Sequence, residues 1–351
     1  MNKFVFGALA VSAGTLCFAN ESEEWPTLDR EIESLATTLT QGGGGMAVNG
    51  FVRTSYATSS DIMVGANDLG GFSMDNIRLE VSGSVGDFNV HVAVEGSSDF
   101  GLGAFGYTGG AAGVGVIDAY TSLNVTDQVT ATIGFFRPPF QGDSLRDEDQ
   151  LLFIDRTVTG DLWAFRDHGV MFSGNFDQLG WWIAAQNGVT GAGDDLALAA
   201  RILFNAMGTG VGAVEGAYGA GDEGNLTLAA GYYDDDGGTD TSAVSFDADY
   251  TRGAMAAAAS LVDYDDGITG AFGGETPWDL TFSYMISPDT WEAAARWDDF
   301  DDSNDTTMIT LGVNRYVEGH AAKWQINYST IDSDASANEA DVIQLGLTVS
   351  V

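Results

Sequence analysis

The chain repeats one pattern, in which apolar and polar residues alternate along a short stretch that ends in a turn or a loop. Residues 77–96, IRLEVSGSVGDFNVHVAVEG, show it in one copy. On either side of Gly86-Asp87, apolar residues stand at every second position and polar residues lie between them. This predicts two strands joined by a two-residue hairpin turn. A soluble sheet and a membrane barrel share this period of two, so a single copy does not distinguish them.

The same pattern recurs to the end of the chain and predicts sixteen strands. An even number of strands, each of about ten residues, suits an antiparallel barrel that crosses a lipid bilayer at a tilt. The predicted strands are residues 46–58, 73–85, 88–96, 116–125, 128–137, 166–175, 179–188, 195–205, 226–234, 243–252, 254–264, 277–286, 290–299, 306–317, 321–330 and 340–351.

The connections between these strands alternate in length. Short turns alternate with long loops at 59–72, 97–115, 138–165, 189–194, 235–242, 265–276, 300–305 and 331–339. Segment 206–225 breaks the rule, because it is long where a short turn is due. Outer-membrane barrels have short periplasmic turns and long external loops. We therefore predict an all-β fold, a transmembrane antiparallel up-and-down β-barrel of about 16 strands formed by residues 46–351, whose apolar strand faces contact lipid.

The residues before the barrel follow other patterns. Residues 1–19 combine Lys3, an apolar run and small residues before Asn20, which predicts a cleaved secretory signal peptide. Residues 20–45 carry apolar residues three and four positions apart and then a run of glycines. They predict a short periplasmic amphipathic helix, either an oligomerisation helix or a tether, followed by a glycine hinge. The chain is thus expected to pass through the periplasm to the outer membrane of a Gram-negative cell.

Charge narrows the choice of partners. The chain has 51 acidic against 13 basic residues and a formal net charge of −38, so nucleic acid would be repelled. Dense carboxylate runs lie at 234–236, 263–266 and 298–305. We interpret them as a solvated anionic surface. The alternative is weak binding of Ca²⁺ or Mg²⁺ that bridges to lipopolysaccharide. No other metal site and no cofactor is predicted, and the expected partners are outer-membrane lipid and lipopolysaccharide.

The longest loop, 138–165, mixes charged residues with the apolar run Leu151–Ile154. A loop that stood in solvent would not need this run. We therefore predict that the loop folds inward, packs against the barrel wall and narrows the pore as a constriction. The alternative is a cap over the mouth. The predicted constriction residues are Asp143, Arg146, Asp147, Glu148, Asp149, Asp155, Arg156 and, at the start of the next strand, Arg166.

Residues 115–190 contain Asp118-Ala119-Tyr120, the run from Gly134 to Phe140 (GFFRPPF), Asp155-Arg156 and the run from Arg166 to Val170 (RDHGV). Through these motifs the segment resembles the phosphate-selective porin O/P family. The resemblance implies a sixteen-stranded, trimeric barrel with an inward-folded third loop. It also implies a ladder of lumenal arginines with a lysine cluster, from which this sequence departs, because it has two lysines in all.

Few cations remain to line a pore. The predicted pore-lining basic residues are Arg53, Arg78, Arg137, Arg201, Arg296 and Lys323, and the other predicted lining residues are Glu80, His91 and Glu95. Acidic residues outnumber them, which favours a general, weakly cation-leaning porin for ions and small hydrophilic solutes. The alternatives are a phosphate- or anion-selective porin and a structural or adhesive barrel without an open pore. An enzyme is not expected, because the chain has three histidines and none has an identifiable nucleophile.

Overall fold

A computed structural model describes residues 45–60, 69–98, 102–103, 106–107, 113–189, 191, 195–237, 241–265, 275–335 and 339–351. The chain divides into two units, residues 1–45 and 46–351. The predicted signal peptide (1–19) and nearly all of the predicted helix and hinge (20–45) lie outside the described residues, so both stay predictions.

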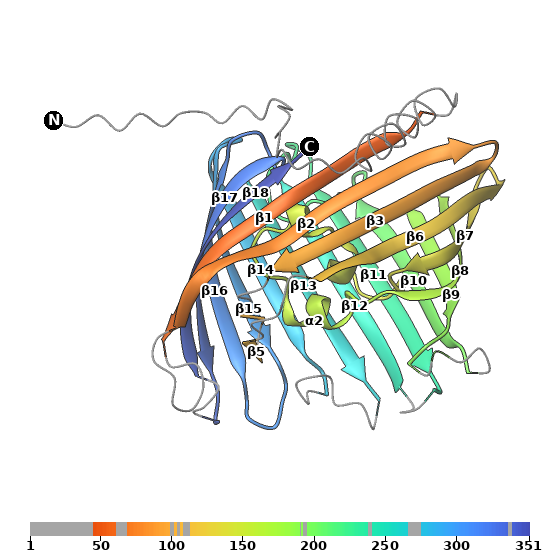
Figure 1. The fold of residues 1–351 in the computed structure, drawn as a ribbon. Helices are drawn as coiled ribbons and strands as arrows, with labels where there is room; N and C mark the ends of the chain where they lie inside the picture. Colours follow the sequence, from red (N-terminus) through yellow and green to blue (C-terminus); the bar gives the residue numbers. More distant parts are fainter. Residues whose placement is uncertain are drawn as a thin grey trace, which may run out of the picture. The chain divides into compact units, whose positions relative to one another are not determined.

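The second unit forms a closed barrel of sixteen antiparallel strands, which confirms the predicted fold (Figure 1). Each barrel strand pairs with its neighbours in the sequence, and β1 closes the barrel against β18 through pairs such as Phe51↔Ser350. The strands are β1 (Ala47–Ser60), β2 (Leu69–Val85), β3 (Phe88–Ser98), β6 (Gly113–Thr126), β7 (Val129–Phe136), β8 (Asp167–Phe176), β9 (Leu179–Gln186), β10 (Ala197–Met207), β11 (Asn225–Asp235), β12 (Thr241–Arg252), β13 (Met255–Tyr264), β14 (Trp278–Ser287), β15 (Trp291–Asp299), β16 (Thr307–Tyr316), β17 (Ala322–Asp332) and β18 (Ala340–Ser350).

Every predicted strand overlaps one strand of the barrel, with ends that differ by a few residues. The predicted loop 97–115 contains one feature that the pattern did not reveal, a separate two-stranded sheet of β4 (Leu102–Gly103) and β5 (Gly106–Tyr107). The tight hairpin at Gly86-Asp87 is present, and Gly86 adopts a φ of 61°, a conformation that glycine adopts without steric cost.

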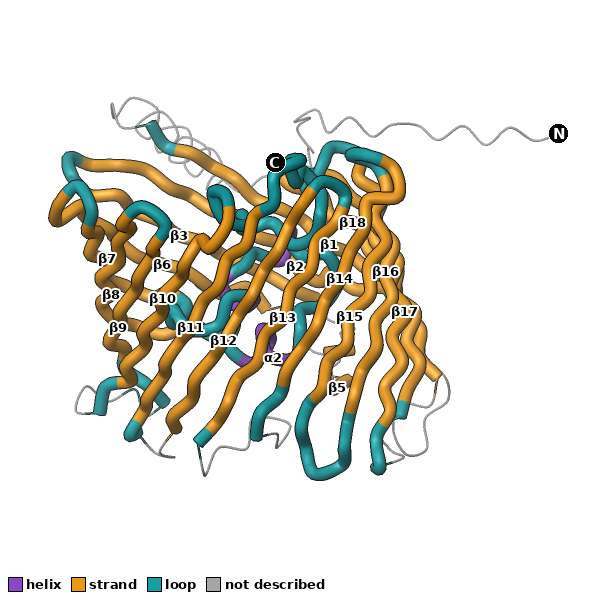
Figure 2. The backbone as a smooth tube through the Cα atoms, turned by 180° about the vertical axis from the view of Figure 1, so that it is seen from behind, coloured by secondary structure: helices purple, strands orange, loops and turns teal. Residues whose placement is uncertain are grey.

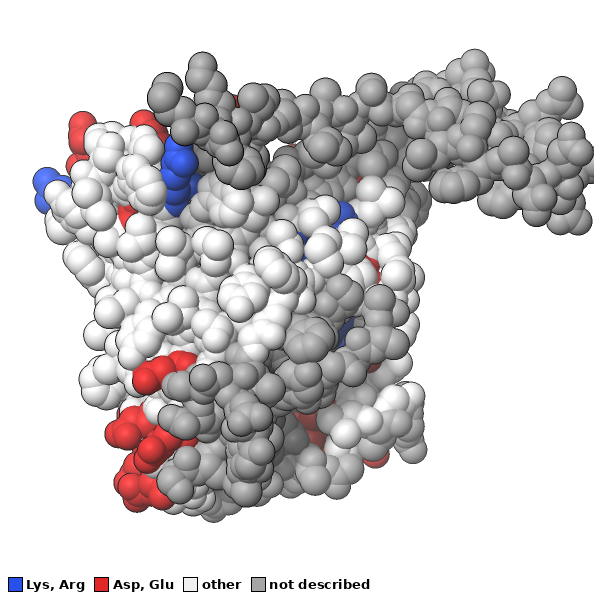
Figure 3. Space-filling view, turned by 60° about the vertical axis from the view of Figure 1, so that its left-hand side comes forward, with Lys and Arg blue, Asp and Glu red and all other residues white. Residues whose placement is uncertain are grey.

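The burial pattern of the strands is the reverse of that in a soluble protein. Along β14, Leu280 and Phe282 are exposed on the outside, whereas Thr281 and Ser283 are buried toward the inside. Figure 3 shows one outer face on which uncharged side chains prevail and acidic side chains gather toward the end that carries the long loops. An apolar outer band around a polar interior is the pattern of barrels whose outside contacts lipid.

Among the connections that the structure describes in full, the third loop and residues 208–224 fold into the barrel. The third loop (138–165) carries η1 (Asp143–Leu145), η2 (Glu148–Gln150) and α2 (Val158–Leu162), and both backbone views place α2 inside the ring of strands (Figures 1 and 2). Residues 208–224, between β10 and β11, enter from the opposite, short-turn end and contact the third loop. No helix in the described part of the chain is both long and apolar enough to cross a membrane.

Candidate functional site inside the barrel

The two ends of the third loop are held together by aromatic packing. Phe140 near its start lies 4.0 Å from Trp163 near its end, measured between ring centroids. Both pack on Tyr233 of β11 within a buried apolar cluster. The backbone carbonyl of Phe140 accepts hydrogen bonds from Arg201 of β10 (2.6 Å) and from Ser245 of β12 (3.0 Å). The loop is therefore a closed lobe that is fixed to the β10–β12 wall.

The apolar run of the loop covers the opposite wall. Leu151, Leu152, Phe153 and Ile154 are buried, as the sequence pattern predicted for a loop that packs inward. Their backbone carbonyls lie outside any sheet and need donors, because a buried carbonyl without a partner is costly. The strands supply these donors through long side chains. Lys323 donates to the Leu151 carbonyl at 2.5 Å, Asn314 to Leu152 at 2.7 Å, and Arg53 to Ile154.

Carboxylates of the wall hold α2 and the start of the loop. Asp298 of β15 accepts a hydrogen bond from the Val158 N–H at 3.1 Å, and Asp279 of β14 accepts one from the Thr159 hydroxyl at 2.7 Å. Asp247 of β12 pairs with Arg201 at 2.6 Å and also accepts from the Gly142 N–H. These acidic residues occupy the polar, inward-facing positions of their strands. Together with the carbonyl contacts, they fix the loop on both sides of the lumen.

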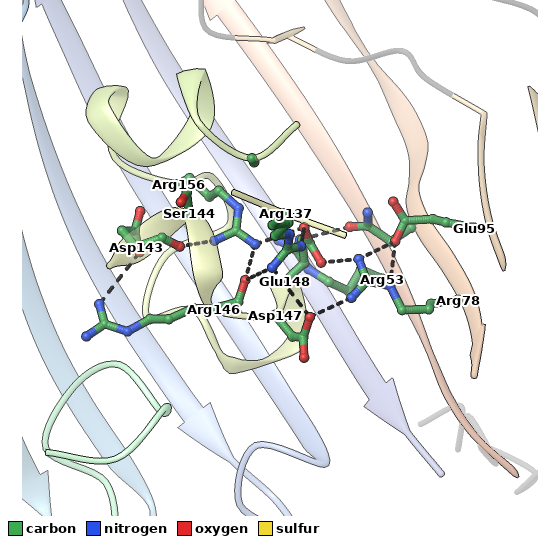
Figure 4. A network of polar contacts seen from close by, with 12 residues as sticks. Arg53, Arg78, Glu95, Arg137, Asp143, Ser144, Arg146, Asp147, Glu148 and Arg156 are labelled. Atoms are coloured by element: carbon green, nitrogen blue, oxygen red, sulfur yellow. Dashed lines mark hydrogen bonds and ion pairs between the residues drawn. The ribbon is translucent and has the colours of Figure 1, made fainter. Parts of the chain in front are cut away.

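A cluster of charged side chains joins the middle of the loop to β2 and β3 (Figure 4). Arg78 of β2 binds Glu95 of β3 through its Nε (2.8 Å), Asp147 through Nη1 (2.8 Å) and Glu148 through Nη2. Arg137 and Arg156 reach the same Glu148 carboxylate at 3.0 and 2.8 Å. Burial alone would raise the pKa of Glu148. The three surrounding guanidinium groups outweigh burial and hold this pKa well below its ordinary range.

The predicted site residues therefore fall into separate groups. Arg78, Glu95, Arg137, Asp147, Glu148 and Arg156 form one network, and Glu80 lies 3.8 Å from Arg78 at its edge. Asp143 and Arg146 belong to it as well, because Arg156 donates to both of their backbone carbonyls. Further contacts join site residues to partners outside the network. Arg146 pairs with Asp249, Arg166 with Asp118, and Arg296 with Asp298; Asp149 accepts from Ser350, Asp155 from Gln344, and Asp143 from Thr157; His91 stacks on Tyr120.

Sequence reasoning overlooked several interior residues. Asp279 and Asp298 occupy the polar, inward-facing positions of their strands. The alternation of apolar and polar residues could have identified them as interior residues. Asp118 and Tyr120 were noted only as part of a family motif. They lie on the inner face of β6, beside His91 and Arg166. Glu215 lies in the segment for which the strand pattern offered no interpretation. Burial raises the pKa of this carboxyl group.

The acidic runs differ in part from the expected solvated surface. Asp235 and Asp298 are fully buried. Asp235 accepts backbone hydrogen bonds from Val189 and Gly237, and Asp298 pairs with Arg296, so for these two residues the expectation was wrong. Long-range contacts explain the difference, because each carboxylate holds a backbone N–H of another connection, Val189 for Asp235 and Val158 for Asp298. Among the residues that the structure describes, no group of three or more His, Cys, Asp and Glu has the geometry to hold a metal ion.

No protein-family model matches the chain, and no curated protein matches it. The resemblance to the phosphate-selective porin O/P family therefore stays a prediction.

Porins are among the solved structures that have the same fold. The chain superposes on OprB of Pseudomonas putida with a TM-score of 0.62 and 10% identity, over 95% of this chain and 100% of that one. It superposes on an anion-selective porin of Comamonas acidovorans with a TM-score of 0.58 and 13% identity, over 88% and 100%. It superposes on a triple mutant of the Rhodopseudomonas blastica porin with a TM-score of 0.59 and 15% identity, over 88% of this chain and 100% of that one. These likenesses establish a shared fold.

Proposed function

We propose that residues 46–351 form an outer-membrane porin, a water-filled channel for passive diffusion of ions and small hydrophilic solutes. The observation that carries the proposal is a closed sixteen-stranded barrel with apolar side chains outside and a charged interior. A polar interior has no value for packing alone, since apolar residues would fill it at lower cost. The fold that the chain shares with solved porins supports the same conclusion.

The third loop is the proposed constriction. Its hydrogen bonds to β1, β10, β12, β14, β15, β16 and β17 hold it inside the barrel rather than over its mouth. A loop tied to so many strands has little freedom to move out of the lumen. The loop narrows the cross-section of the lumen that remains for solutes. It also places Asp147 and Glu148 beside this remaining opening.

A weak preference for cations follows from the exposure of the charged side chains, because the carboxylates are more exposed to water than the arginine. The Asp147 side chain is 51% exposed and that of Glu80 is 24% exposed, whereas that of Arg78 is 1% exposed. Ions in the lumen would therefore meet carboxylates first. The arginine charges lie behind them and are already compensated by ion pairs. Salt weakens the preference, because the Debye length is only about 8 Å at physiological ionic strength.

The same contacts weigh against strict selectivity for phosphate. Arginine binds phosphate through its planar fork of N–H donors. All three nitrogens of the Arg78 guanidinium already contact carboxylates, so phosphate would have to displace them. We therefore favour a general pore over the phosphate-selective alternative. We further propose a homotrimer that is embedded in outer-membrane lipid, contacts lipopolysaccharide and reaches its site through the periplasm.

Conductance across a planar lipid bilayer tests the proposal. Purified protein should give stepwise currents, and a KCl gradient should give a small reversal potential of the sign expected for cations. An opposite sign, or block of chloride current by micromolar phosphate, would favour the anion-selective alternative. Folded, heat-modifiable protein that carries no current would favour a structural barrel without an open pore.

A further inference from the structure

We propose that residues 208–224 are a second constriction element, which closes one side of the lumen from the short-turn end. Solutes then pass along the wall of β2, β3 and β6. The inference deepens the proposed porin function and rests on it. The segment is the one connection that breaks the alternation of short turns and long loops, because it is long where a short turn is due. Its contacts inside the barrel explain why it is long.

The first observation is how firmly the segment is bound inside the barrel. The Ala217 N–H donates to the buried carboxylate of Glu292 on β15 at 2.6 Å. Tyr218 packs on Tyr316 of β16 with ring centroids 4.4 Å apart, and Ala217 joins a buried cluster with Met285 and Tyr316. Residues of the segment therefore replace water against the inner faces of β14, β15 and β16.

The second observation is the space around the segment, which itself supplies most of the lining of a large cavity. At the short-turn end, a cavity of about 780 Å³ is bounded by Gly208, Val211, Tyr218 and His320, among others. Beyond it, next to Glu215, two further cavities measure only about 10 and 20 Å³. Such volumes hold roughly one water molecule each. Neither of the two small cavities next to Glu215 is wide enough for a hydrated ion or solute, so they offer no passage onward from the large cavity.

The third observation is a contrast in exposure between the two sides of the barrel. Inward-facing polar residues on β14 to β17, such as Ser283, Glu292, Asn314 and Lys323, are fully buried. Those on β3 and β6 are not, since Asn89 and Asn124 are exposed and His91, Tyr120 and Ser122 are half-buried. The wall of β2, β3 and β6 thus keeps contact with water. It adds Asp118 and Tyr120 to the side chains that a passing solute would meet.

A matched pair of cysteine variants tests which wall lines the pathway. Ser122 of β6 and Ser283 of β14 both face inward, four residues before the end of their strands, at Thr126 and Ser287. The one cysteine of the sequence is Cys17 and residues 46–351 contain none, so each variant carries a single barrel thiol. A cationic methanethiosulfonate should lower the conductance of Ser122→Cys and leave that of Ser283→Cys unchanged. Equal modification of both variants would overturn the proposal.

Shortening the segment gives an independent test. Residues 209–223 are replaced by a two-residue hairpin turn, the type that joins β2 to β3. The single-channel conductance should rise, and Ser283→Cys in this background should now react with the reagent. Unchanged conductance in a folded variant would overturn the proposal. Wild-type protein without conductance would instead contradict the porin function itself, so the two failures are distinguishable.

Discussion

The carboxylate of Glu215 accepts a hydrogen bond from the backbone N–H of Leu152 at 2.7 Å, which joins the two segments that enter the barrel from opposite ends. A second bond runs from the Glu215 N–H to the Gln150 carbonyl at 3.1 Å. Each segment thus supplies the hydrogen-bond partner that the other lacks. Because both are irregular chain inside a closed barrel, neither has strand neighbours to satisfy its backbone.

Glu215→Ala should loosen the third loop. The substitution leaves the Leu152 N–H buried without an acceptor, which costs about 1–3 kcal/mol. We expect more frequent current fluctuations in single-channel recordings, whereas Glu215→Gln, which keeps an acceptor oxygen, should be closer to wild type. Glu223→Ala is the control, since Glu223 is exposed in the same segment. Equal noise in the two alanine variants would contradict a link between the segments.

Arg201→Met should destabilise the barrel. Arg201 pairs with Asp247 at 2.6 Å and donates to the Phe140 carbonyl. Removal of one partner from such a buried pair costs about 3–5 kcal/mol, because the other charge stays buried and uncompensated. The temperature at which the folded band disappears from a gel should fall. Arg252→Met, at an exposed arginine, should change stability by no more than about 0.5 kcal/mol. Similar losses in both variants would argue against the anchor.

Glu148 should stabilise the folded protein in a pH-dependent way. Its pKa is held below the ordinary value, so its contribution is fully present above about pH 5 and is lost as the pH falls through the lowered pKa. Glu148→Gln should therefore be less stable than wild type at pH 7, and the difference should shrink below about pH 4. Urea unfolding across this range measures it. The control Glu318→Gln alters an exposed turn residue and should show no such trend.

The sequence predicts the barrel well because a barrel strand is a local pattern. Alternation such as that from Leu280 to Ser283 is set by the two environments on either side of one strand, and it needs no knowledge of distant residues. The inward loop was predictable for a similar reason. Its apolar run at Leu151–Ile154 demands burial wherever the loop lies.

The partners inside the barrel were not predictable in the same way. Lys323 donates to the carbonyl of Leu151, 172 positions away, and carbonyls carry no side-chain signature in a sequence. The role of residues 208–224 was also hidden, because a glycine-rich stretch with few large apolar side chains gives no periodic pattern. The structure was needed to join Glu215 to Leu152.

Shortening of the third loop should widen the pore. Residues 142–150 carry the charged middle of the loop, whereas Phe140 and Trp163 hold its two ends. Removal of residues 142–150 leaves the aromatic contact between Phe140 and Trp163 in place and frees the space beside β2. Single-channel conductance should rise in a folded variant. If it stayed unchanged, solutes would not pass beside this part of the loop.

The exposed carboxylates beside Arg78 should set the ion selectivity of the pore. Glu80→Gln combined with Asp147→Asn removes the two most water-exposed carboxylates beside Arg78 and leaves the Arg78–Glu95 contact in place. The reversal potential in a KCl gradient should move toward zero or toward anion preference. Asp87→Asn also removes a carboxylate, but in a short turn outside the lumen, and should leave the potential unchanged.

Salt separates this local effect from the large net charge of the protein. Carboxylates at a constriction act on ions within a few ångströms, where screening is weakest, whereas charges on the distant loops are screened beyond about 8–10 Å. If Glu80 and Asp147 set the selectivity, the difference between the double variant and wild type should persist, although reduced, as the salt concentration rises. A difference that vanished already at moderate salt would place the selectivity in the outer acidic loops.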